Sequence, residues 1–175
     1  MGRLLALPDG QNGQKPEIQD VESLFLDSGA HTLWNKHVKD RWHSHDRWAF
    51  YETPEFWAYV DDYAEFLKKR KKHIDYYVSV DVIFNPEKSW EVLKYMEEEH
   101  GLTPVPVIHC NTSLEWLEKH LEAGYEFIGI GGLGQTITGA VFRRWADQVF
   151  ARICPGPSYL PIVRTHGFAM TSHEL

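Results

Sequence analysis

Two aspartates, two histidines and a glycine-rich run each come at or near the end of a short apolar segment, where buried strands end. In chain order, residues 24–26 precede Asp27-Ser28-Gly29-Ala30, residues 77–80 precede Asp81, and residues 105–108 precede His109. Residues 127–130 precede Gly131-Gly132-Leu133-Gly134, and residues 160–163 precede Thr165-His166-Gly167-Phe168. A partly desolvated carboxylate suits acid–base catalysis or recognition of a polar ligand edge. A glycine-rich run lets the backbone approach a ligand closely.

Each feature also has a purely structural interpretation. A single aspartate can cap a loop or helix, and a single histidine at a strand end is usually a buried hydrogen-bonding residue. The glycine run fits a tight turn, and it matches neither the dinucleotide fingerprint nor a Walker phosphate loop. Ser28 lacks the Gly-x-Ser-x-Gly pattern of serine hydrolases. Two aspartates at equivalent positions, Asp27 and Asp81, favour a functional site.

The elements that position these residues alternate between strand and helix. Thr53-Pro54 and Asn85-Pro86 each predict a helix start with an N-cap followed by proline. Residues 112–115 match a capping box, and 139–153 predict a further helix. This alternation predicts an α/β fold with a parallel sheet, in which the carboxyl ends of the strands form one edge and carry the site.

The length of the chain limits the form of that sheet. The 175 residues supply five strands, with 4–7 as a sixth, whereas a closed eight-stranded barrel typically needs about 250 residues. We therefore expect a single domain over 1–175 that resembles an incomplete TIM barrel, with five to six parallel strands of eight. Residues 31–52 are too long for a plain connection and are interpreted as a lid or insertion.

Composition narrows the classes of function. The net charge of −7 argues against broad nonspecific nucleic-acid binding, although basic residues cluster in 36–47 and 68–72. The two cysteines support neither a disulfide framework nor a zinc site. His37, His43 and His45 have no matching carboxylate, so we expect no metal and no cofactor. The chain has no secretory signal and no apolar stretch of about 20 residues, which predicts a cytoplasmic protein without a membrane span.

Taken together, the motifs at the ends of these apolar segments resemble those of a known family. Asp27-Ser28-Gly29-Ala30 is similar to the Asp-Ser-Gly-Gly/Ala element of tRNA-guanine transglycosylases, the queuine and archaeosine tRNA-ribosyltransferases. Asp81 matches their second aspartate, Gly131-Gly132-Leu133 their Gly-Gly-Leu element, and His166-Gly167-Phe168 a late strand. The order and approximate spacing agree from about residue 22 onward. The pattern looks closest to phage and bacterial proteins that place 7-deazaguanines in DNA.

The resemblance implies a TIM barrel that exchanges guanine in DNA or tRNA for a 7-deazaguanine through a covalent glycosyl-enzyme intermediate. Asp27 would be the acid–base group, and Asp81 would accept hydrogen bonds from the amino and ring N–H edge of the purine. The backbone at Gly131, Gly132 and Leu133 would donate to the purine carbonyl. His109 stands roughly where the family has a base-contacting glutamine, and His166 would also line the base site.

The sequence departs from the family in two respects. The family's nucleophilic aspartate follows the His-Gly-Phe element on a later strand, which the 175 residues do not include, and its zinc-binding cluster has no counterpart. The leading hypothesis is therefore a transglycosylase-like domain of a bacterium or phage-infected host that needs a C-terminal complementing chain or a second copy. The alternatives are a noncatalytic purine-binding module or remnant, and an unrelated small lyase or isomerase that uses Asp27, Asp81 and His109.

Overall fold

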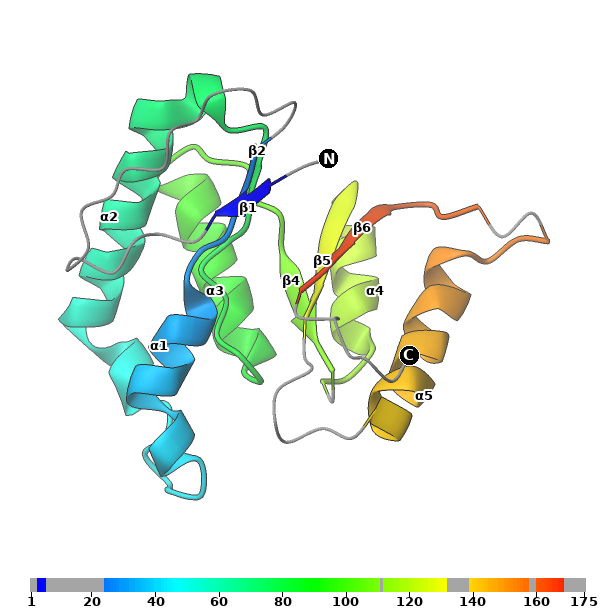
Figure 1. The fold of residues 1–175 in the computed structure, drawn as a ribbon, viewed down its shortest axis with the longest axis horizontal. Helices are drawn as coiled ribbons and strands as arrows, with labels where there is room; N and C mark the ends of the chain where they lie inside the picture. Colours follow the sequence, from blue (N-terminus) through cyan, green and yellow to red (C-terminus); the bar gives the residue numbers. More distant parts are fainter. Residues whose placement is uncertain (1–2, 6–23, 111, 132–138, 158–159, 169–175) are drawn as a thin grey trace.

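The computed structural model describes residues 3–5, 24–110, 112–131, 139–157 and 160–168, and within them short parallel strands form two sheets (Figure 1). The first sheet has the order β1 (Arg3–Leu5), β2 (Leu24–Leu26) and β3 (Tyr76–Tyr77). The second has the order β4 (Val107–His109), β5 (Phe127–Gly131) and β6 (Arg164–Gly167). The predicted α/β class with parallel strands is confirmed.

A single parallel bridge joins the two sheets. Val78, directly after β3, pairs with Val105, directly before β4. Ser79 N donates to Val105 O at 3.0 Å, and Val105 N donates to Tyr77 O at 2.8 Å. The strands therefore neighbour one another in chain order from β1 to β6. Among the described residues no pairing connects β6 back to β1, so these strands do not form a closed barrel.

The joined sheets curl strongly. The ring of Phe25 on β2 stacks on that of His166 on β6, with centroids 4.6 Å apart. These strands are four positions apart, and with a strand spacing of about 4.8 Å a flat sheet would separate them by about 19 Å. The curl creates an inner face, where Phe25 packs with the buried residues Val78, Val105 and Val107.

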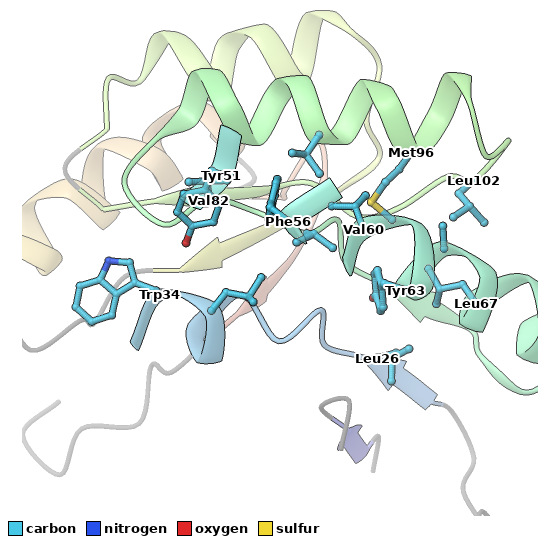
Figure 2. Close-up of a cluster of buried hydrophobic side chains, with 14 of the residues drawn as sticks. Leu26, Trp34, Tyr51, Phe56, Val60, Tyr63, Leu67, Val82, Met96 and Leu102 are labelled. Carbon is cyan, nitrogen blue, oxygen red and sulfur yellow. The ribbon is translucent and has the colours of Figure 1, made fainter. Parts of the chain in front are cut away.

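Five helices in the described residues cover the outer side of the sheets (Figure 1). They are α1 (Ala30–His37), α2 (Pro54–Arg70), α3 (Pro86–Glu98), α4 (Glu115–Glu122) and α5 (Gly139–Ile153), and three short 3₁₀ helices lie at Lys39–Arg41, Ala49–Glu52 and Lys71–His73. Figure 2 shows the core between the first sheet and α1–α3, where Leu26 and Val82 lie with Phe56, Val60 and Met96. A second core joins β4 and β5 to α4 and α5.

Two of the predicted helix starts are confirmed, and a third differs. The Thr53 hydroxyl accepts a hydrogen bond from Phe56 N, and the Asn85 side chain accepts one from Lys88 N. The capping box at 112–115 is wrong. The Thr112 hydroxyl instead donates to His109 O at 2.6 Å, and Ser113 accepts from Glu115 N.

The last predicted strand lies later in the chain than the apolar run 160–163. Leu160 and Ile162 are 70% and 62% exposed, and Pro161 has no N–H to donate to a sheet. The strand is β6, Arg164–Gly167, which places His166 inside a strand rather than after one.

The segment 31–52, interpreted as a lid or insertion, folds largely as helix. It contains most of α1 and two 3₁₀ helices, and it buries Trp34, Val38 and Tyr51 in the first core. Its role as a lid stays a prediction. Among the described residues, no helix combines the length and apolar character that a membrane crossing requires.

Candidate functional site

Asp81 lies beyond the end of β3, and His109 is the last residue of β4. Val80 and Val82, on either side of Asp81, pack into the first core. Ile108 packs into the second core, so its neighbour His109 points to the inner face. His109 Nε2 and Asp81 Oδ2 lie 2.6 Å apart, and both side chains are less than a tenth exposed. Because a carboxylate only accepts hydrogen bonds, the Nε2–H of His109 is the donor.

Asp27 directly follows β2 and lies close enough to Asp81 for their charges to interact. Burial raises the pKa of Asp27, and the negative charge of Asp81 raises it further. Backbone N–H groups act in the opposite direction, among them that of Gly29, which donates to Asp27 Oδ1 at 3.4 Å. Two carboxylates whose charges interact at a strand edge are suited to acid–base chemistry.

Gly131 leaves room for the His109 ring. The two residues pair in register on β4 and β5. A Cβ atom at position 131 would lie 3.0 Å from both Cε1 and Nδ1 of His109, closer than an ordinary contact. Glycine at this position therefore allows the imidazole to reach Asp81. Gly132 and Leu133, which the resemblance assigns to the same site, lie outside the described residues.

His166 lies further from the carboxyl end of β5 than His109 does. It pairs in register with Gly129, whereas His109 pairs with Gly131, two residues further along β5. Its ring stacks on Phe25. Burial lowers the pKa of His166, and the charge of Asp27 partly opposes that effect. His166 therefore contacts the apolar inner cluster through Phe25 and also lies within electrostatic range of Asp27.

Three residues of this region carry buried polar atoms that have no hydrogen-bond partner within the described chain. They are Ser28 Oγ, Tyr51 Oη and His109 Nδ1. Burial raises the pKa of Tyr51, and the charge of Asp81 raises it further, which places this hydroxyl within electrostatic range of Asp81. Unpaired buried polar atoms are rare and are often found where a protein binds a ligand or water.

The sequence did not single out Tyr51 or Phe84. Tyr51 belongs to the segment 31–52, which the sequence predicts to be a lid or insertion because of its length, without assigning a role to any single residue in it. Phe84 precedes the Asn85-Pro86 cap, and its ring lies 6.1 Å from that of His109. The Asn-Pro dipeptide signals a turn but does not show that the preceding ring faces the site.

The arrangement favours recognition of a polar, N–H-bearing ligand. Within the described residues Asp81 Oδ1 accepts no hydrogen bond, while Oδ2 is held by His109. Asp27, with a raised pKa, is suited to give and take a proton. The described residues contain no group of three or more histidine, cysteine, aspartate or glutamate side chains placed to hold a metal ion.

No protein-family model, no curated protein and no solved structure matches this chain.

Proposed function

We propose that this chain binds a guanine-type base on its inner face, as part of a transglycosylase-like site that exchanges guanine in DNA or tRNA for a 7-deazaguanine. The protein would act in the cytoplasm of a bacterium or a phage-infected host. The proposal combines the motif resemblance with the positions of Asp27, Asp81 and His109.

The proposal includes a TIM-barrel-like architecture. Neighbouring strands that follow chain order, the Val78–Val105 bridge and the contact between Phe25 and His166 across the sheet all support it. In such barrels active sites lie at the carboxyl ends of the strands. Asp27, Asp81, His109 and Gly131 all lie at or just beyond strand ends on this side.

The observation that carries the proposal is the fixed, buried carboxylate of Asp81. Its Oδ2 is held by His109 at 2.6 Å, which orients the group and directs Oδ1 to another donor. Guanine and 7-deazaguanine present adjacent ring N–H and amino donors along one edge. A buried carboxylate is a strong acceptor for such a pair, because hydrogen bonds to charged groups are stronger than neutral ones.

Exchange further requires acid–base and nucleophilic groups. A nucleophilic carboxylate attacks the C1′ atom of the nucleotide, and the glycosidic bond breaks as Asp27 gives a proton to the departing guanine. The incoming base then returns a proton to Asp27 and displaces the carboxylate from C1′. We assign the base contacts to Asp81, His109, His166 and the backbone at Gly131, Gly132 and Leu133; the nucleophilic carboxylate is not among these residues.

The test is incorporation of labelled guanine into DNA and, separately, tRNA, with and without a complementing C-terminal fragment. We expect incorporation into one of the two nucleic acids, abolished by Asp27→Asn and unchanged by Asp62→Ala on the exposed side of α2. Base binding without incorporation under every condition would instead identify a noncatalytic binding module. The absence of both would refute the proposal.

A further inference from the structure

Phe84 has a backbone conformation that its residue type disfavours. It is the third residue of a turn closed by Asn85 N, which donates to Val82 O at 2.8 Å. Its φ is 63°, and no other non-glycine residue in the described chain has a positive φ. Turns with a positive φ at the third position favour glycine or asparagine, and a bulky residue there is strained.

Packing in the protein core does not account for this strain. Phe84 is half-buried and belongs to none of the three apolar clusters of the described residues, although its neighbours Val82 and Ile83 pack in the first one. Its ring instead contacts two other rings edge-on. The centroids of Trp42 and His109 lie 5.4 Å and 6.1 Å from that of Phe84, at interplanar angles of 61° and 64°.

These contacts hold the ring beside the polar site. His109 is the residue that binds Asp81, so Phe84 lies against the Asp81–His109 pair. Trp42, which also contacts the Phe84 ring, is itself packed edge-on against Trp48 at 5.8 Å. Strained residues that surrounding structure holds in place are concentrated at ligand-binding and active sites.

We propose that Phe84 is the stacking wall of the base site, and that a planar heteroaromatic ring bound to Asp81 packs face-on against it. This inference rests on the proposed function, which supplies the base. It adds the residue that selects for a flat aromatic ligand, because a carboxylate alone would also accept hydrogen bonds from amides and guanidines that have no aromatic ring. Trp42, from the segment 31–52, is then a positioning residue for Phe84.

Because the positive φ of Phe84 is strained, replacing this residue with glycine is expected to affect stability and base binding differently. Phe84→Gly removes the ring and relieves the positive φ, so it should melt at the same temperature as the wild type or higher while binding the base more weakly. Loss of base–aromatic stacking predicts a roughly five- to 150-fold increase in Kd for 7-deazaguanine. Phe84→Tyr should retain the affinity, and Phe84→Leu, which is apolar but not planar, should lose it.

The experiment is calorimetric titration of the intact chain and these variants with 7-deazaguanine, with melting curves for each protein. Phe66→Leu, at a half-buried phenylalanine of α2 that contacts Arg70, is the matched control and should bind like the wild type. Wild-type binding with unchanged affinity in Phe84→Gly and Phe84→Leu would overturn the stacking role and leave the proposed function standing. No binding by the wild type would overturn both.

Discussion

The buried hydrogen bond between Asp81 and His109 predicts strong energetic coupling between the two residues. Their side chains are 7% and 9% exposed, and the bonded atoms lie 2.6 Å apart. Replacing either residue with alanine leaves the other without its partner in a buried environment, which typically costs about 3–5 kcal/mol. The double variant removes both groups, so no polar group of the pair remains unpaired.

The coupling follows from these values. If each single variant loses about 3 kcal/mol of unfolding free energy, independent effects would add to about 6 kcal/mol. A hydrogen bond to a charged group contributes about 1.5–3 kcal/mol, so we expect the double variant to lose only about 3–4.5 kcal/mol. The predicted coupling energy is therefore about 1.5–3 kcal/mol.

Urea unfolding of Asp81→Ala, His109→Ala and the double variant, followed by far-UV circular dichroism, measures this coupling. Arg152 and Glu118 provide a matched control, because their side chains lie 2.7 Å apart but are 40% and 48% exposed. An exposed pair of this kind should couple by at most about 1 kcal/mol. Equal coupling energies for the two pairs would refute the buried geometry of the site.

Two further predictions concern pH. The raised pKa of Asp27 means that the folded state holds its proton more tightly than the unfolded chain, so this carboxyl costs stability as the pH rises above its ordinary value of 3.8. Asp27→Asn should therefore be more stable than the wild type in urea unfolding at pH 7, with little difference at about pH 3; a less stable variant at pH 7 would contradict this. The lowered pKa of His166 means that the folded state favours the neutral ring, so stability falls as the pH drops through 6.5. His166→Phe, which keeps a ring against Phe25, should lose less melting temperature than the wild type between about pH 8 and 5, and an identical loss would count against this environment.

Local signals in the sequence predicted the elements best. Thr53-Pro54 and Asn85-Pro86 cap helices through contacts within one turn, so nothing distant is needed to recognise them. The error at Thr112 arose because its hydroxyl bonds the carbonyl of His109 at the end of β4 instead. The misplaced last strand shows that an apolar run alone does not locate a strand where proline interrupts it.

The site was predictable in its residue types but not in its arrangement. Asp27, Asp81 and His109 were recognised because each comes at the end of a short apolar run. The hydrogen bond between Asp81 and His109 depends on how β3 and β4 are joined, since the two residues are 28 positions apart in sequence. The position of the Phe84 ring depends on the positive φ of Phe84 and on its contact with Trp42. A residue pattern reveals neither the φ nor the contact.

Calorimetric titration of the purified chain with 7-deazaguanine, alongside Asp81→Ala and the control Asp62→Ala, tests the central claim most directly. We predict saturable binding by the wild type and Asp62→Ala. In Asp81→Ala the ring N–H and amino groups of the base lose their acceptor, which costs about 1–3 kcal/mol and should raise Kd at least about fivefold. No binding by the wild type, or equal affinity in Asp81→Ala, would contradict the account.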